Sequence, residues 1–391
     1  MLSEVSFTVG GAFVGVDLEF IEGPLTITLD VDRGMIAGIE KGFKGLDLRG
    51  YVASPPLADM HVHLLDYAIS EEGWDLDIDS VVGEPYGLKY VLLEKLGNEV
   101  IKLALSRVLS HIKALGIGLL VEFRELGIRG LSIDVKADLN HYVLGMPSSH
   151  KPSINEVTKI LRLSNGIAIS SPNYFSYEDL KMIYSLARQS RSYVFVHIAE
   201  TRDARAEGDF EKVLKTGKPT AIVHGVWLSR DDLELLKHYD IPLILCLRSN
   251  RWFLSGYPRV KDIYVLGITV GLGTDNAGWI KPDLWRDGEE LLLSLRAQGV
   301  NDALWVMKAL TTNASRILGI DYYLGEGVKA NIMFLRRDVL NIDVVKNKHL
   351  SFIKRGGSEA VGGILISGRP SLCRWDVEAL CNSVRNVISR R

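Results

Sequence analysis

The hydrophobic pattern divides the chain into a strand-rich beginning, a long middle of mixed character and a strand-rich end. Short runs with β-branched residues and partial alternation predict early strands at Val5–Val9, Phe13–Phe20, Leu25–Val31 and Met35–Ile39. Strand patterns return after about residue 321, at Ala330–Phe334 and Gly363–Ile366, before a helical tail from Trp375. We therefore predict that residues 1–54 and 322–391 form one small sheet domain.

The middle stretch, residues 55–321, has a different texture. It contains eight apolar runs, each followed by a loop and most by a helical pattern: the Val52–His63 region, Ile117–Phe123, His141–Leu144, Ile167–Ser170, Tyr193–His197, Ala221–His224, Leu243–Leu247 and Thr269–Gly273. Eight strand–helix units in about 265 residues are typical of a (β/α)₈ TIM barrel. A doubly wound open sheet would use fewer strands, and no glycine fingerprint follows any of these runs. We predict an α/β protein with such a barrel.

Polar residues stand at or directly after the ends of several of these runs. They are His61, His63, His197, His224 and Asp275. His61 and His63 are two positions apart on a predicted strand, so their side chains point to the same face. The carboxyl ends of all barrel strands meet at one mouth, where catalytic groups lie. Because burying such groups without partners would be costly, the sequence predicts that they form one site.

The residue types in this predicted site indicate a metal ion. Three imidazoles and one carboxylate suit Zn²⁺ or Fe²⁺ better than Mg²⁺ or Ca²⁺, and we expect Zn²⁺, with Fe²⁺ as the alternative. Glu200 follows His197 by three positions, where a carboxylate can move protons between a water molecule and a leaving nitrogen. The alternative for Glu200 is a loop salt bridge with Arg202 or Arg205.

Several motifs give the chain a specific resemblance to a known family. They are Pro56-Leu-Ala-Asp-Met-His-Val-His63, His197-Ile-Ala-Glu-Thr201, His224-Gly-Val-Trp-Leu-Ser229, Cys246-Leu-Arg-Ser-Asn250, Gly273-Thr-Asp275 and Gly327-Val-Lys-Ala-Asn331. Together they resemble the amidohydrolase superfamily, in its branch of cytosine, guanine and adenosyl-type deaminases and chlorohydrolases. The resemblance covers nearly the whole chain. It implies a (β/α)₈ barrel with a small β-sandwich domain built from both chain ends.

The resemblance also implies roles for single residues. It assigns the metal-ligand role to His61, His63, His197 and Asp275. Asp275 would also take a proton from the attacking water, His224 would hold or polarise that water or act as a fifth ligand, and Glu200 would be the general acid and base. Two-metal relatives carry a carboxylated lysine after the fourth barrel strand, but residues 166–173 contain no lysine, so we expect one ion. A strand-four histidine of adenosyl-type deaminases is also missing, which argues against a nucleoside-thioether substrate.

Polar and aromatic residues near the same strand ends are candidates for substrate binding. They are Arg124, Glu125, Arg248, Asn250, Asn276 and Trp279. An arginine could bind a carboxylate, a phosphate or a ring carbonyl, and the alternative is that the charged groups pair with one another. Trp279 or Trp285 could stack on a heterocycle, and packing inside the fold is the alternative. The segments Glu71–Tyr90 and Trp279–Trp285 are candidate lids.

Composition narrows the classes of function. The chain of 391 residues has 46 Lys and Arg against 48 Asp and Glu, which leaves no broad basic surface for nucleic acid. No apolar run reaches the ~20 residues that span a bilayer, so we expect no membrane partner. Three cysteines, odd in number and widely spread, argue against a secreted disulfide framework and favour the cytoplasm. The expected partner is a small-molecule substrate, and a homo-oligomer stays open.

The leading functional hypothesis is a metal-dependent deaminase with one divalent ion. It would replace an amino group on a purine, pyrimidine, pterin or nucleoside-like heterocycle by hydroxide and release ammonia. A cyclic-amide hydrolase or a carbon–chlorine hydrolase could use the same site. The alternative from a different class is a catalytically inactive relative with a structural role, which is less favoured because every expected ligand and Glu200 are present.

Overall fold

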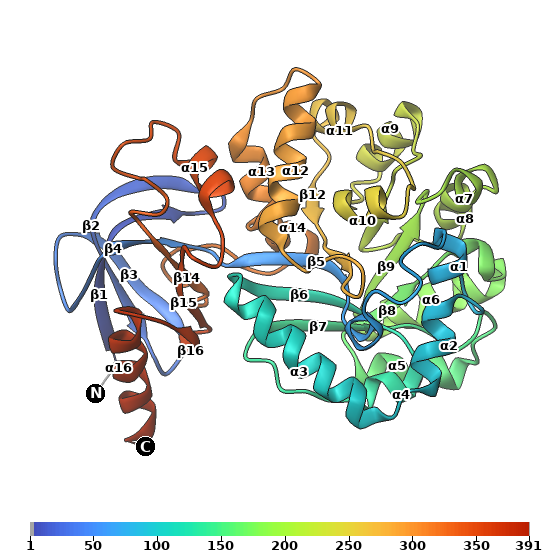
Figure 1. Ribbon diagram of the computed structural model, residues 1–391, viewed down its shortest axis with the longest axis horizontal. Helices are drawn as coiled ribbons and strands as arrows, with labels where there is room; N and C mark the ends of the chain where they lie inside the picture. Colours follow the sequence, from blue (N-terminus) through green and yellow to red (C-terminus); the bar gives the residue numbers. More distant parts are fainter. Residues whose placement is uncertain (1–3, 391) are drawn as a thin grey trace.

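Strands from the two ends of the chain form one continuous sheet. The computed structural model describes residues 4–390, and its first four strands pair with its last three in the order β16-β15-β14-β4-β1-β2-β3. β14 runs antiparallel to β4 and so joins the two ends of the chain, on the left of Figure 1. The strands are β1 (Glu4–Val14), β2 (Glu19–Asp30), β3 (Met35–Lys41), β4 (Leu46–Ser54), β14 (Ile332–Arg336), β15 (Val361–Ile366) and β16 (Arg369–Cys373).

The last helix, α16 (Val377–Ser389), packs on this sheet. Its apolar face, with Val377, Leu380 and Val384, shares a buried core with Phe7 and Phe334 of the sheet. The predicted sheet domain from both chain ends is therefore confirmed, and its core consists of one sheet with a helix on it. The limits of this domain at residues 54 and 322 stay a prediction.

Two predicted strands are divided in the structure. The Phe13–Phe20 prediction was wrong, because β1 ends at Val14 and a turn with Gly15 at φ 74° leads into β2. The Val52–His63 region contains two strands, since Pro55 and Pro56 separate β4 from β5 (Leu57–His63). Proline has no backbone N–H to donate to a sheet, which explains the break. This short connection joins the sheet domain to the barrel.

A disulfide between Cys373 and Cys381 departs from the expectation drawn from the cysteine count. The two cysteines are eight positions apart, and the chain turns from β16 into α16 between them. Cys246 is free and buried. In the described part of the chain there is therefore one local cross-link between a strand and a helix, which count and spread alone did not reveal.

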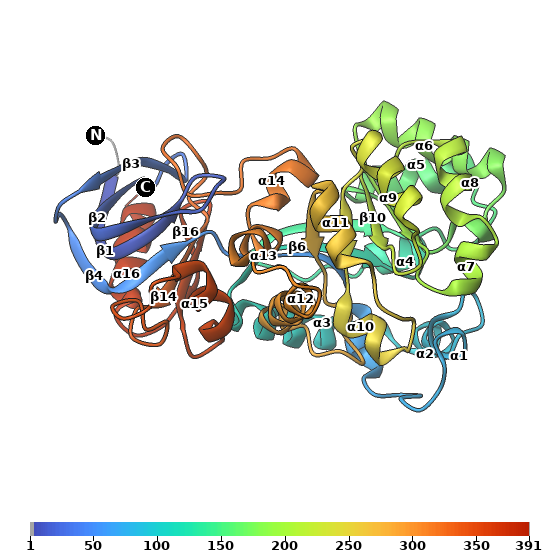
Figure 2. The same cartoon turned by 90° about the horizontal axis from the view of Figure 1, so that it is seen from above.

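Eight parallel strands form a closed barrel next to the sheet domain, as predicted (Figure 2). Each strand pairs with the next along the chain, and the last pairs with the first, where Leu272 is opposite Asp59. A two-residue strand, β13, extends the closure at the mouth. The strands are β5, β6 (Ile117–Arg124), β7 (Asn140–Gly145), β8 (Gly166–Ile169), β9 (Tyr193–Ile198), β10 (Ala221–His224), β11 (Leu243–Leu245), β12 (Val270–Leu272) and β13 (Asp275–Asn276).

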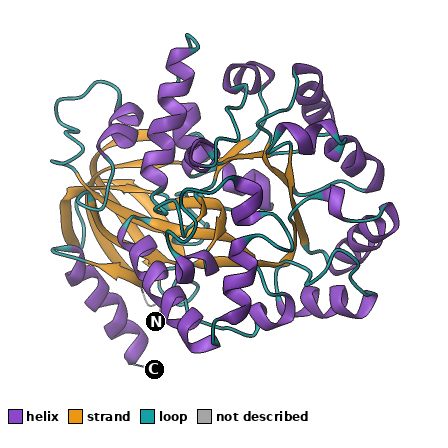
Figure 3. Cartoon of the chain, turned by 45° about the vertical axis from the view of Figure 1, so that its right-hand side comes forward, coloured by secondary structure: helices purple, strands orange, loops and turns teal. Residues whose placement is uncertain are grey.

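Helices surround the barrel, as Figure 3 shows. Their capping follows local sequence: Ser229 and Asp232 form a reciprocal capping box at the start of α9, as S/T-x-x-D/E patterns do. The helices are η1 (Leu65–Ile69), α1 (Ile78–Val82), α2 (Leu88–Lys95), α3 (Asn98–Ala114), α4 (Gly127–Leu131), α5 (Ile154–Leu163), η2 (Pro172–Tyr174), α6 (Tyr177–Ser190), α7 (Arg202–Ala206), α8 (Asp209–Thr216), α9 (Arg230–His238), α10 (Leu247–Trp252), α11 (Val260–Leu266), α12 (Leu284–Ala297), α13 (Ala303–Leu310), α14 (Asn313–Leu318) and α15 (Lys348–Arg355).

The barrel interior is filled with apolar side chains below the mouth. Met60, Val121, Phe123 and Phe195 are fully buried in this core. The segment between β5 and α3 contains η1, α1 and α2. Because it follows β5, it begins at the carboxyl end of the strands, which is the mouth of the barrel. A membrane-spanning helix would have to be longer and more apolar than any helix within residues 4–390.

Candidate metal centre

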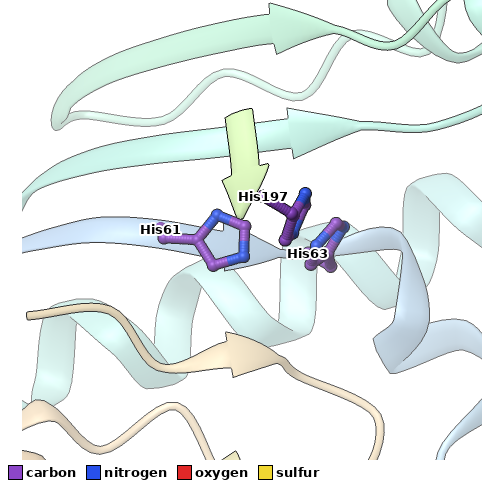
Figure 4. A group of neighbouring side chains, drawn as sticks. All are labelled: His61, His63 and His197. Carbon is purple, nitrogen blue, oxygen red and sulfur yellow. The ribbon is translucent and has the colours of Figure 1, made fainter. Parts of the chain in front are cut away.

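Three histidines meet at the carboxyl ends of two barrel strands. His61 and His63 come from β5 and His197 from β9 (Figure 4). The pairing of β5 with β6 is irregular between Asp59 and Val62. Met60, within this interval, is buried in the apolar core of the barrel. Such an irregularity re-aims the side chains that follow, and here both histidines turn inward. One ring nitrogen of each histidine lies within 4.8 Å of those of the other two.

Hydrogen bonds fix the orientation of two of these rings. The Nδ1–H of His63 donates to Oε1 of Glu125 at 2.5 Å. The Nδ1–H of His197 donates to the carbonyl oxygen of Ile169 at 3.1 Å. Both bonds leave Nε2 free, which is how proteins orient histidines that bind a metal. The third ring, His61, has its Nε2 3.1 Å from Oδ1 of Asp275.

A second group completes the site from β9, β10 and β13. Glu200, His224 and Asp275 each place one ligand atom within 4.8 Å of the others. The Nδ1–H of His224 donates to Oδ1 of Asn250 at 2.9 Å, and its Nε2 lies 3.5 Å from Oε2 of Glu200. His224 and Asp275 have φ angles of 72° and 66°. This left-handed conformation is uncommon outside glycine, and strain of this kind clusters at functional sites.

Burial sets the protonation of these groups. Burial and the neighbouring imidazoles lower the pKa of His197 well below its usual value, so the ring is neutral, as a ligand must be. Burial alone would raise the pKa of Asp275, but the hydrogen bond with His61 and the nearby histidines hold it well below its usual range. Burial raises the pKa of Glu200, and the negative charge of Asp275 acts in the same direction.

The donor set fits a divalent metal ion. His61 Nδ1, His224 Nε2 and Asp275 Oδ2 are buried and have no hydrogen-bond partner within residues 4–390. Leaving such atoms unpaired costs about 1–3 kcal/mol each, so these atoms indicate a missing partner. Neutral imidazoles with one carboxylate are ligands that Zn²⁺ and related ions prefer. The expected ligands His61, His63, His197 and Asp275 are therefore brought together as a group.

A buried charge network supports His63 from the segment after β5, and no sequence pattern predicted this network. Nζ of Lys89, on α2, lies 2.7 Å from Oε1 of Glu125 and 3.0 Å from Oδ1 of Asp66. All three side chains are at most 1% exposed. Glu125 was predicted as a substrate contact, and its Oε1 instead holds both His63 and Lys89. Asp66 and Lys89 were missed, because nothing local distinguishes them from surface residues.

The predicted substrate residues divide into those near the site and those away from it. Arg124 points away from the barrel interior, where it pairs with Glu122 at 2.5 Å and donates to the carbonyl oxygens of Gly130 and Ile133. This arrangement matches the alternative in which the charged groups pair with one another. It does not fit a contact between Arg124 and the substrate. Arg248 similarly lies 3.2 Å from Asp287.

The other candidates for substrate binding are two asparagines near the imidazoles and two tryptophans. Asn250 is buried and orients His224, and Asn276 is buried on β13 opposite His63. Trp279 donates from Nε1 to the carbonyl oxygen of Glu72, which ties the two predicted lid segments together. Trp285 donates to the carbonyl oxygen of Leu115 and packs on Phe352, so it belongs to the core. The stacking role for Trp285 is therefore wrong.

Two neighbouring cavities lie at this mouth. The first, of about 90 Å³, is lined by His197, Glu200 and Ser170 together with residues of α1. The second, of about 360 Å³, lies between α2 and the loops after β6 and β7. Glu84, which follows α1, lines both. The predicted salt bridges of Glu200 are not seen in the described residues, since Arg205 pairs with Glu211 and Asp232.

Solved structures share this architecture. An adenosine deaminase from Xanthomonas campestris with bound zinc aligns with a TM-score of 0.82 at 16% identity, over 99% of this chain and 98% of that one. The atrazine chlorohydrolase TrzN from Arthrobacter aurescens TC1 in complex with zinc aligns with a TM-score of 0.80 at 16% identity, over 98% and 100%. At such identities the likeness shows the fold.

Sequence relatives cover most of the chain. The uncharacterized protein MJ0699 of Methanocaldococcus jannaschii is 28% identical over 334 residues, which is 79% of this chain and 85% of that protein. The 5-methylthioadenosine/S-adenosylhomocysteine deaminase of Aquifex aeolicus is 24% identical over 380 residues, 87% of each. The model of the amidohydrolase family matches residues 52–368, which include every residue of the metal centre. The chain thus belongs to the amidohydrolase family of metal-dependent hydrolases.

Proposed function

We propose that this protein is a deaminase that hydrolyses an amino group from a heterocycle and releases ammonia. The observation that carries the proposal is the placement of Glu200 next to His224 and Asp275, at the same mouth as three converging histidines. A site that only bound a metal would need no partly exposed carboxylate with a raised pKa. The Aquifex aeolicus relative and the Xanthomonas campestris structure are both deaminases by name, which supports the same reaction class.

The metal is proposed to be a single Zn²⁺ ion held by His61, His63, His197 and Asp275. When bound, such an ion lowers the pKa of water toward ~7 and so supplies a nucleophile at neutral pH. The zinc in the two solved relatives supports this choice over Fe²⁺. The position of a bridging lysine in two-metal relatives falls near Ser170, whose hydroxyl donates to Glu84 at 2.7 Å.

The residues of this chain divide the proton transfers between them. His224 Nε2 and Asp275 Oδ2, both unpaired in the described structure, can orient the attacking water and accept its proton. Glu200 has a raised pKa and lines the smaller cavity, so it can carry a proton to the ring nitrogen next to the attacked carbon. Glu200 then takes the proton of the newly added hydroxyl group and passes it to the departing amino group, and the proton held by Asp275 returns to Glu200. Carbon–nitrogen cleavage gives the hydroxylated ring, in its carbonyl form, and ammonia.

The test is ammonia release by the purified, zinc-loaded protein from aminopurines, aminopyrimidines, their nucleosides and pterins. Glu200→Gln should retain zinc and lower kcat by roughly 10²- to 10⁴-fold, because it removes the proton carrier. Glu178→Gln, an exposed carboxylate in the first turn of α6, is the matched control and should leave kcat unchanged. Full activity of zinc-loaded Glu200→Gln would refute the role of Glu200.

The products separate the deaminase from the alternatives that share this site. Ring-opened product without ammonia would identify a cyclic-amide hydrolase, and halide release a carbon–chlorine hydrolase. A zinc-loaded protein that releases no ammonia from the panel would favour the cyclic-amide or carbon–chlorine hydrolase and would make the inactive structural relative worth testing.

A further inference from the structure

The larger cavity at the barrel mouth has an unusual distribution of charge. Its walls are apolar on several sides, through Tyr90, Val91, Leu126 and Met146. Its ionisable side chains include the carboxylates of Glu84, Glu94 and Glu125 and the imidazole of His150. No lysine or arginine is found among the lining residues that the structure describes. A cavity of about 360 Å³ falls in the size range of small-molecule sites.

This cavity borders the proposed reaction centre through two side chains. Glu125 lines it and holds the metal ligand His63 through Oε1. Glu84 lines it and also lines the smaller cavity that contains Glu200. The smaller cavity, of about 90 Å³, has the volume of about three water molecules and holds only part of a heterocyclic substrate. The remainder of the substrate therefore lies outside the smaller cavity, and the cavity past Glu84 offers it a place.

One oxygen in the cavity is left for a ligand. Oε2 of Glu125 is buried and has no hydrogen-bond partner in the part of the chain that the structure describes. The Glu125 carboxylate is paired through Oε1 with Lys89 Nζ at 2.7 Å and with His63 Nδ1 at 2.5 Å. An unpaired, buried carboxylate oxygen requires a donor. The ligand group that reaches it must therefore carry a hydroxyl, an amide N–H or an ammonium.

Glu84 is held rigidly at the junction of the two cavities. Its Oε1 accepts from the Tyr90 hydroxyl at 2.9 Å, and its Oε2 accepts from His150 Nε2–H at 2.9 Å and from the Ser170 hydroxyl at 2.7 Å. These bonds come from α2 and from the loops after β7 and β8. His150 is therefore engaged with Glu84, and the cavity offers an incoming anion no free cation.

Two cations close to the lining residues are paired as well. Lys89 is buried between Asp66 and Glu125. Arg129 lies at the outer rim, 3.2 Å from Glu94. An anionic group entering the cavity would face Glu84 and Glu125 in a partly desolvated space, where like charges repel strongly.

We propose that this cavity selects substrates by charge: it binds the part of the substrate that is not attacked, accepts a neutral or cationic hydrogen-bond donor there, and rejects a phosphate or carboxylate. The proposal rests on the proposed deaminase function and refines its substrate class. A heterocycle with a hydroxylated or amino-bearing substituent fits, whereas the corresponding nucleotide does not. Glu84 and Glu125 are the residues that determine this specificity.

The experiment compares adenosine, 5′-amino-5′-deoxyadenosine and adenosine 5′-monophosphate with the zinc-loaded protein. We expect kcat/KM for the monophosphate to be at least about 100-fold below that for adenosine, and the amino compound to equal or exceed adenosine. Val91→Lys adds a cation to the cavity wall at an exposed position and should raise the monophosphate-to-adenosine ratio about tenfold, mainly through KM. Glu84→Gln should change the ratio in the same direction. Val100→Lys, a change at another exposed valine, on α3 outside the cavity, is the control.

Binding of the same three compounds to zinc-loaded Glu200→Gln, measured by calorimetry, separates the two proposals. If no compound releases ammonia but adenosine binds and the monophosphate does not, the deaminase function fails and the charge selection stands. Equal turnover or equal binding of adenosine and its monophosphate overturns the charge selection. So does an unchanged ratio in Val91→Lys, or the absence of binding by all three compounds.

Discussion

The hydrogen bond between Asn250 and His224 offers a sharp test of how the site is organised. Asn250 Oδ1 accepts from His224 Nδ1–H at 2.9 Å, and both side chains are at most 1% exposed. This bond fixes the proton on Nδ1 and leaves Nε2, which lies 3.5 Å from Glu200, free to accept. Asn250→Ala removes the acceptor and leaves a buried imidazole N–H unpaired. Asn250→Asp keeps an acceptor in the same place.

The magnitude follows from the cost of one unpaired buried donor, about 1–3 kcal/mol. If that energy is lost in the transition state, kcat/KM falls by roughly 5- to 150-fold, at 1.36 kcal/mol for each factor of ten. The assay is ammonia release with the best substrate, combined with ¹⁵N NMR of labelled histidine to determine the His224 tautomer. Ser249→Ala, an equally buried neighbour on α10, is the control.

Asn250→Ala should show a mixed His224 tautomer and the reduced kcat/KM, while Asn250→Asp and Ser249→Ala keep the Nδ1–H form. The reasoning is refuted if Asn250→Ala retains both the Nδ1–H tautomer and a kcat/KM within twofold of the parent. A loss of kcat/KM with an unchanged tautomer would instead assign Asn250 a direct substrate contact through its unpaired Nδ2.

Three further predictions concern stability. Burial raises the pKa of Asp287 to about 7, so the folded protein holds an extra proton between about pH 4 and 7 and loses stability as the pH rises through that window. Asp287→Asn should remove this pH dependence, which amounts to at most about 4 kcal/mol in the free energy of unfolding measured with urea. Parallel curves of stability against pH for the variant and the parent would contradict this. Replacing Cys373 and Cys381 by serine should lower the free energy of unfolding by about 2–3 kcal/mol without changing kcat, and equal denaturation midpoints would argue against the cross-link. Trp285→Phe leaves the Leu115 carbonyl oxygen unpaired and should cost about 1–3 kcal/mol with unchanged KM, whereas an altered KM would place Trp285 at the site after all.

The barrel and the convergence of the expected metal ligands were predictable because both depend on local patterns. Parallel strands buried on both faces read as continuous apolar runs, and polar residues at their ends stand out against them. His197 and His224 end β9 and β10 in the structure as their sequence context indicated. The irregularity in β5 that turns His61 and His63 inward was not predictable from the sequence. The two side chains still lie on the same side, as their spacing predicted.

The orientation of Arg124 was predictable in principle. Glu122 and Arg124 have the same parity on β6, and Phe123 has the opposite one. Phe123 packs on His61 with ring centroids 4.3 Å apart, so the interior face belongs to Phe123 and Glu125. Strict use of strand alternation would have placed Arg124 outside the barrel. Its ion pair with Glu122 follows from that placement.

The charge network could not be predicted from the sequence. Lys89 lies on α2 and Glu125 directly after β6, 36 positions later, so no local pattern connects them. Its presence nevertheless follows from charge balance once the fold is known. Asp66, Glu125 and Asp275 are buried carboxylates around the imidazole cluster, and Lys89 contributes one positive charge among them. Burying these carboxylates without a cation would be costly, so Lys89, which contacts both Asp66 and Glu125, is the partner that their burial requires.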